Sequence, residues 1–120
     1  MINDKLIVRK LAGNADNPSV MQLNGPITLL NLFDLQTTVR EDTSQALILD
    51  MTGVPVVDSA GIGLLVNAHV SRMNSGRRLA LAGVAERIKT ILTVTGVYGV
   101  FSVFPTVDAA QESLRQPANP

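Results

Sequence analysis

Apolar residues in the first third of the chain follow two spacings, one typical of strands and one typical of a helix. Residues 5–11 and 20–24 are β-favouring runs separated by the turn-forming segment 13–18, which predicts an antiparallel hairpin. Thr28 is then a candidate N-cap for a helix that reaches about Glu41. The apolar positions that recur there at three- and four-residue steps are Leu29, Leu32, Phe33, Leu35 and Val39. This stripe predicts the face that packs on a sheet.

The rest of the chain repeats a strand followed by a helix. Continuous apolar runs predict strands at 46–49, 79–82 and 100–104. Helical spacing predicts helices from about Gly61, over 86–95, and from a Thr106 N-cap to about Arg115. The predicted core stripe of the first of these helices is Ile62, Leu65, Val66 and Met73. Gly76 and Gly96 are candidate helix stops.

The predicted element order is therefore β-β-α-β-α-β-α-β-α. Repeated βαβ units require parallel neighbouring strands, whereas the hairpin adds an antiparallel strand. We expect an α/β fold with a mixed central β-sheet and helices packed on it. The length of 120 residues suits one domain, over 4–115, and residues 116–120 are expected to be a frayed tail.

Charge and composition narrow the classes of partner. Ten basic and ten acidic residues cancel, so no overall positive field favours nucleic acid. Without cysteine there are no disulfides and no thiolate metal ligands, which is consistent with a reducing compartment. The N-terminus does not resemble a signal peptide, and no apolar run reaches the ~18 residues of a membrane helix. The sequence predicts a cytoplasmic protein without direct membrane insertion.

The longest loop after a predicted central strand spans 50–61, and ligands of open α/β sheets meet such loops. Ser59 precedes a glycine-containing helix start, so its hydroxyl is expected at a helix N-terminus, where a phosphate is tolerated. The alternative is that Ser59 only caps the helix.

Hydrolase chemistry at Ser59 is not supported. A nucleophile elbow requires Gly two residues before the serine, and that position is Val57. The single imidazole, His69, lies ~12 Å beyond Gly61 along the same helix and cannot reach Ser59. We expect His69 to have a core or rim role, and no catalytic residue is assigned.

Asp50 ends a central strand, as the phosphoacceptor of a response-regulator receiver does. A receiver also needs an acidic pair for Mg²⁺ after the first strand, and only Asp4 and Asp16 are near. We therefore expect Asp50 to satisfy loop N–H groups, rather than to work with Asp58 as an acid–base pair. No metal-ligand spacing of histidines and no phosphate-binding P-loop is present.

Several segments together resemble the STAS domains of bacterial anti-sigma factor antagonists. They are LDMTGV at 49–54, VDSAGIGLL at 57–65, GRRLAL at 76–81, ILTVTGV at 91–97 and the last helix at 107–114. The resemblance implies partner switching: the unphosphorylated protein binds an anti-sigma factor that is also a serine kinase, and so releases a sigma factor. It places phosphorylation on Ser59 and partner binding on Asp58, Ser59 and Ile62.

The same resemblance implies a serine phosphatase that restores the active form. ATP and Mg²⁺ belong to the kinase, so no cofactor of the chain's own is expected. Thr28 departs from the family pattern, which often has an acidic residue there. The alternative function is a STAS module in a stressosome scaffold or a transporter-associated subunit, without control of a sigma factor.

Overall fold

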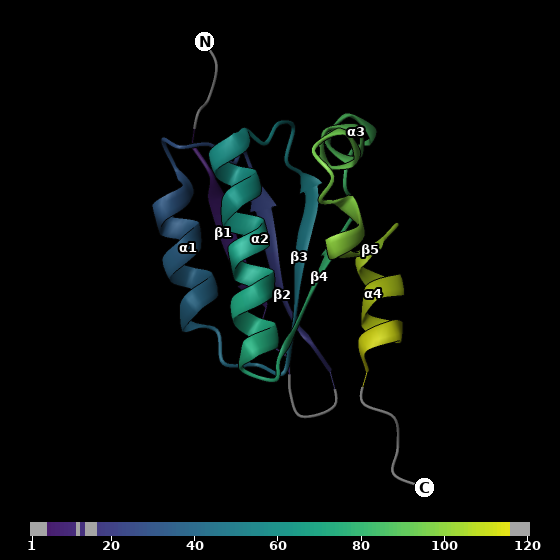
Figure 1. The fold of residues 1–120 in the computed structure, drawn as a ribbon. Helices are drawn as coiled ribbons and strands as arrows, with labels where there is room; N and C mark the ends of the chain where they lie inside the picture. The colour runs from purple at the N-terminus through teal and green to yellow at the C-terminus, as the bar shows by residue number, and fades with distance from the viewer. Residues whose placement is uncertain (1–4, 12, 14–16, 116–120) are drawn as a thin grey trace, which may run out of the picture.

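The structure is a computed structural model that describes residues 5–11, 13 and 17–115 (Figure 1). Its strands are β1 Ile7–Leu11, β2 Ser19–Asn24, β3 Ala46–Gly53, β4 Arg78–Ala82 and β5 Ser102–Phe104. Its helices are α1 Leu32–Glu41, α2 Ser59–Asn74, α3 Glu86–Val94, the short 3-10 helix η1 Tyr98–Val100, and α4 Val107–Leu114. The predicted order is confirmed, with η1 added before β5. Part of the predicted hairpin turn and the predicted tail, 116–120, lie outside the described residues.

The five strands lie in the sheet in chain order, β1-β2-β3-β4-β5. The β1–β2 pair is antiparallel, and the pairs β2–β3, β3–β4 and β4–β5 are parallel. The pairs β2–β3 and β3–β4 are each joined through one helix and β4–β5 through α3 and η1, and such crossovers are right-handed. The mixed sheet that the sequence predicts is confirmed.

Two hydrophobic layers cover the two faces of the sheet. The larger layer joins α1, α2 and α3 to one face, and its fully buried members include Leu35, Leu65 and Leu92. The smaller layer joins α4 to the other face, where Leu114 packs with Ile48. Figure 1 shows α1 and α2 side by side in front of the sheet. Both helices therefore end at the edge where β3 and β4 begin.

Helix α1 begins at Leu32, three residues later than a Thr28 N-cap predicts. Thr28 is not its N-cap, because Asn31 holds that position and its side chain accepts the N–H of Thr28 at 2.9 Å. The predicted core stripe is confirmed at Leu35 and Val39 but is wrong at Leu29 and Phe33, which are 61% and 65% exposed. Leu29 lies in the turn before α1 and Phe33 in its first turn, and neither side chain belongs to the layer that packs on the sheet.

Helix α2 begins at Ser59, two residues earlier than predicted, and its buried face is rotated. Leu65 is buried and Ile62 and Val66 pack against the core, but Met73 is 59% exposed. Arg72 occupies the core-facing position and is only 4% exposed. Its guanidinium is held by the backbone carbonyls of Asp42, Ser44 and Arg78.

The C-terminal predictions are largely confirmed. Thr106 caps α4, since its hydroxyl accepts the N–H of Ala109 at 3.0 Å. Gly96 follows the end of α3 with a φ of 81°, in the left-handed region that glycine adopts without strain. The last strand is shorter than predicted, because Val100 belongs to η1.

Candidate functional site

The candidate site forms where the β2–α1 loop and the β3–α2 loop meet. The N–H of Gly25 donates to the carbonyl of Gly53 at 3.0 Å, and the N–H of Ile27 donates to Val56 at 3.0 Å. The carbonyl of Ile27 accepts the N–H of Asp58 at 3.1 Å. These backbone bonds make the two loops one surface at the carboxyl ends of β2 and β3.

Gly61 allows the first turn of α2 to approach the β2–α1 loop. A Cβ atom at Gly61 would lie 2.4 Å from the carbonyl oxygen of Ile27 and 2.8 Å from a methyl of Val57. Both distances are shorter than real Cβ contacts, so a larger residue would push the helix start and the loop apart. The absence of a side chain at Gly61 therefore sets the distance between α2 and the β2–α1 loop.

Asp58 is the N-cap of α2 and also ties the two loops together. Its Oδ1 accepts the N–H of Gly61 at 2.8 Å, which satisfies one of the free donors of the helix start. Its Oδ2 accepts the N–H of Leu29 at 3.1 Å. Both oxygens of the carboxylate are therefore engaged in structural hydrogen bonds.

Ser59 is the first residue of α2 and is exposed. The alternative that Ser59 caps the helix is wrong, because Asp58 does so. Among the described residues, the Ser59 hydroxyl has no hydrogen-bond partner. A group attached to this oxygen would lie at the positive end of the α2 dipole and replace no internal contact.

Ile62 lies one turn after Ser59 and is half-buried against the core. Its N–H donates to the carbonyl of Asp58 at 2.9 Å, within the first turn of the helix. The structure thus brings the three predicted partner-binding residues, Asp58, Ser59 and Ile62, to one helix start.

Sequence reasoning missed an apolar patch beside this helix start. Leu29, Leu30 and Phe33 are 61%, 81% and 65% exposed, and Leu29 is bonded to Asp58 through its backbone. We call Asp58, Ser59 and Ile62, together with these three residues, the switch surface. One signal was available in the sequence, because the adjacent Leu29 and Leu30 cannot both face the core of one helix. Exposed large apolar side chains in a cluster are typical of interaction surfaces.

The remaining candidates have structural roles. Asp50 accepts the N–H of Thr52 at 3.1 Å and its hydroxyl at 2.6 Å, as predicted for a loop carboxylate. His69 is half-buried, with its ring 5.9 Å from Phe101 in an edge-to-face contact. Within the described part of the chain, no three His, Asp or Glu side chains are grouped as metal ligands would be. The helices of residues 17–115 also include none with the length and apolar character of a membrane crossing.

Comparison with known proteins agrees with this fold and loop arrangement. The STAS domain family model matches residues 10–110, and the chain belongs to the STAS domain family. An anti-sigma-B factor antagonist of Staphylococcus aureus (strain NCTC 8325 / PS 47) is 26% identical over 93 residues, which cover 78% of each chain. The range that the family model matches contains the whole switch surface.

Two solved structures show the same architecture. An anti-sigma factor antagonist from Mycobacterium paratuberculosis superposes with a TM-score of 0.80 at 20% identity, covering 94% of this chain and 97% of that one. A sulfate transporter family protein from Wolinella succinogenes superposes with a TM-score of 0.66 at 27% identity, covering 78% and 81%. The STAS fold is thus confirmed.

Proposed function

We propose that this chain is an anti-sigma factor antagonist that binds an anti-sigma factor with serine kinase activity and is switched off by phosphorylation of Ser59. The observation that carries the proposal is the state of the Ser59 hydroxyl, which is exposed and has no partner among the described residues. Asp58, and not Ser59, caps the helix, so the Ser59 hydroxyl has no part in capping. The similarity to an anti-sigma-B factor antagonist supports the choice of partner.

The physical effect of a phosphate on Ser59 has two parts. The modification adds about 1.5 to 2 negative charges, and the helix N-terminus offsets about half a charge. The fold therefore tolerates the phosphate, but the switch surface becomes strongly negative beside Asp58. A partner surface that fits a neutral serine would have to accept or bury that charge, and the complex would weaken.

The apolar half of the switch surface strengthens this effect. Leu29, Leu30 and Phe33 bury apolar area when a partner covers them, which favours binding. A doubly charged phosphate retains its hydration, so a phosphate on Ser59 keeps water at the edge of this apolar contact and opposes its burial. Phosphorylation of Ser59 can then control the interface, although the neutral serine side chain contributes little to the binding energy.

The test is to incubate the protein with a candidate anti-sigma factor kinase and ATP, and to locate the added phosphate by mass spectrometry. We expect one phosphate, on Ser59, and complete loss of labelling in Ser59→Ala. Ser102→Ala is the matched control, because Ser102 is also exposed and lies in β5. Phosphate on another residue, or labelling that persists in Ser59→Ala, would reject the switch. A serine phosphatase that removes the phosphate should restore binding of the kinase.

The similarity to a sulfate transporter family protein favours a second candidate, a STAS subunit that docks on a transporter. The two functions separate in a direct binding assay. An antagonist binds a purified anti-sigma factor and loses this binding in the phosphorylated form. A transporter-associated subunit would bind no anti-sigma factor in either form.

A further inference from the structure

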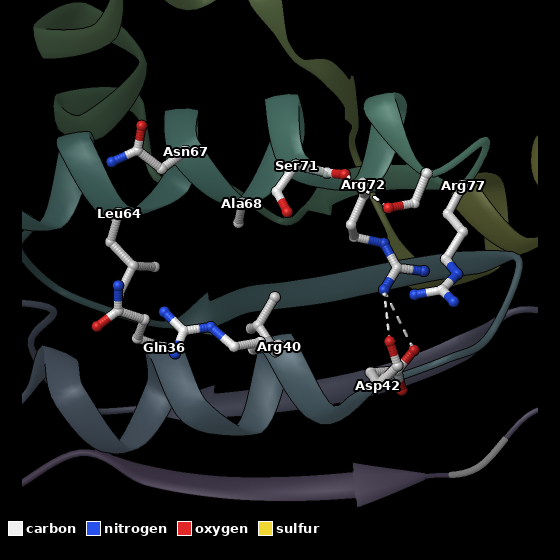
Figure 2. A pocket seen from close by; sticks show the side chains of 11 residues that line it. Gln36, Arg40, Asp42, Leu64, Asn67, Ala68, Ser71, Arg72 and Arg77 are labelled. Carbon is white, nitrogen blue, oxygen red and sulfur yellow. Dashed lines mark hydrogen bonds and ion pairs between the residues drawn. The ribbon is translucent and has the colours of Figure 1, made fainter.

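A cleft of about 160 Å³ lies between α1 and α2 and runs along α2 from Leu64 to Arg77 (Figure 2). Arg77 follows Ser59 by eighteen residues, most of them helical, so the Arg77 end of the cleft is ~20 Å from Ser59. Its lining is Gln36, Val39, Arg40, Asp42, Leu64, Asn67, Ala68, Ser71, Arg72, Ser75 and Arg77. The base is apolar, and the rim is polar and rich in arginine. The function proposed above does not use it.

The single carboxylate in the cleft is fully engaged. Asp42 is 2% exposed, and its two oxygens lie 3.3 Å from the Lys10 ammonium and 3.3 Å from the Arg72 guanidinium. It also accepts hydrogen bonds from the backbone and the hydroxyl of Ser44. Asp42 therefore has no capacity left to neutralise another cation.

Arg72 is equally engaged, but the other two arginines are not. The Arg72 guanidinium donates to Asp42, Ser44 and Arg78. Among the residues that the structure describes, the side chains of Arg40 and Arg77 have neither an ion pair nor a hydrogen bond. Figure 2 shows Arg77 beside Arg72, and Arg40 on the α1 side near Gln36.

Arg77 is close enough to Arg72 for the two charges to repel. Burial lowers the pKa of Arg72, Asp42 opposes that change, and the Arg77 cation lowers the pKa further. An anion beside Arg77 would offset this repulsion, so the charges at this end of the cleft favour an anion.

The negative ends of the two helix dipoles do not neutralise the arginines of the cleft. The C-termini of α1 and α2 each contribute about half a negative charge, and Asp42 contributes one. Arg40, Arg72 and Arg77 contribute three positive charges, so about one positive charge remains before Lys10 is counted. Arg40 and Arg77 line the cleft from opposite ends with the Ser71 hydroxyl between them, and guanidinium groups suit a phosphate because their geometry matches its oxygens.

We propose that this cleft binds a small phosphate-bearing anion, held by Arg77 and Arg40 with the Ser71 hydroxyl as a further donor. Figure 2 shows the Ser71 side chain directed into the space between the helices. The apolar base formed by Val39, Leu64 and Ala68 offers room for a short carbon chain on a phosphate monoester.

The test is a titration of the full chain with inorganic phosphate at constant ionic strength, followed by amide chemical shifts. A second titration uses glycerol 1-phosphate. Comparison of the two titrations shows whether the cleft prefers free phosphate or a phosphate monoester. We expect saturable shifts around the cleft in at least one titration. Arg77→Gln loses one charged hydrogen bond and should weaken phosphate binding about tenfold. Arg40→Gln should also weaken phosphate binding.

Arg87→Gln is the control, because this substitution removes the same charge from a residue in α3 that lies outside the cleft. Thermal unfolding of each variant confirms that it is folded. No saturable binding in either titration would overturn the proposal. Equal weakening in Arg87→Gln would also overturn it, because that result indicates a general charge effect. Neither outcome depends on the function of Ser59.

Discussion

Asp58 accepts the backbone N–H of Leu29 at 3.1 Å, across a sequence separation of 29 residues. The other oxygen of the same carboxylate caps α2 through Gly61 at 2.8 Å. One side chain therefore sets both the start of α2 and the path of the loop before α1. Since Asp58 immediately precedes Ser59, the proposed switch and the loop tie are adjacent in the structure.

Removal of the Asp58 carboxylate should destabilise both loops. Asp58→Ala loses the N-cap and the bond to Leu29, and we expect the free energy of unfolding to fall by about 1–2 kcal/mol. Asp58→Asn retains one carbonyl oxygen and should lose less. Urea denaturation measures the difference. An Asp58→Ala variant as stable as the wild type would show that these two bonds contribute nothing.

The two glycines of the first turns of α2 should respond in opposite directions. Gly61→Ala places a methyl 2.4 Å from the carbonyl of Ile27 and should destabilise the fold by about 1–3 kcal/mol. Gly63 has open space around it, so Gly63→Ala should stabilise the helix by about 0.5–1 kcal/mol. Chemical denaturation of the pair tests the close approach. Equal effects of the two substitutions would contradict it.

Ser59 should be dispensable for stability. Its side chain is exposed, so Ser59→Ala should change the free energy of unfolding by less than about 0.5 kcal/mol. Ser59→Asp places a negative charge at the helix N-terminus, which is favourable, beside Asp58, which is not, and the net effect should also be small. Thermal unfolding monitored by circular dichroism provides the measurement. A large loss in Ser59→Ala would mean that Ser59 has a structural role.

The Asp42 network should make stability depend on acid pH. Burial alone raises the pKa of Asp42, but hydrogen bonds from Ser44 and the Lys10 ammonium outweigh it, so the pKa lies below its usual value. Stabilisation by this group is present above the unfolded pKa of about 3.9 and is lost as pH falls through the lower folded value.

Asp42→Asn measures the contribution of this network. It leaves Arg72 buried without its carboxylate, and we expect a loss of about 3 kcal/mol at pH 7. The loss should shrink at acid pH, as pH falls below about 3.9 and then through the lowered folded pKa, because the wild-type carboxylate also becomes protonated there. Asp34→Asn, an exposed position on α1, is the control and should change little. A loss in Asp42→Asn that is the same at both pH values would contradict the ionic role.

The apolar half of the switch surface should affect binding without affecting folding. Leu30 is 81% exposed, so Leu30→Ser should leave the free energy of unfolding nearly unchanged. If a partner covers this side chain, its binding should weaken by roughly tenfold, as for the loss of one buried leucine. Calorimetry with the anti-sigma factor tests this, and Val94→Ser, which is equally exposed on α3, is the control.

The order of strands and helices was predictable because apolar spacing alone distinguishes the two. Leu47 to Leu49 form a continuous apolar run, and the structure buries them on both faces of the sheet. The start of α1 was predicted wrongly because Leu29 follows helical spacing but is held in a turn by Asp58. No local pattern predicts a bond between residues so far apart in sequence.

Arg72 shows a second limit of sequence reasoning. The sequence predicts Met73, and not Arg72, on the buried face of α2, yet Arg72 is buried because its carbonyl and carboxylate partners come from the α1–β3 loop and β4. Its burial rotates α2 and exposes Met73. The hydrophobic stripe indicates that a helix packs, but the partners available in the fold decide which face it buries.

Helix α4 is the only described helix whose buried residues pack with the second face of the sheet, through Ala110 and Leu114. Without α4, the face that contains Ile48 and Ala80 is open to water. A variant that ends before residue 107 should therefore retain the residues of all five strands and still aggregate, so the docking of one short helix governs solubility.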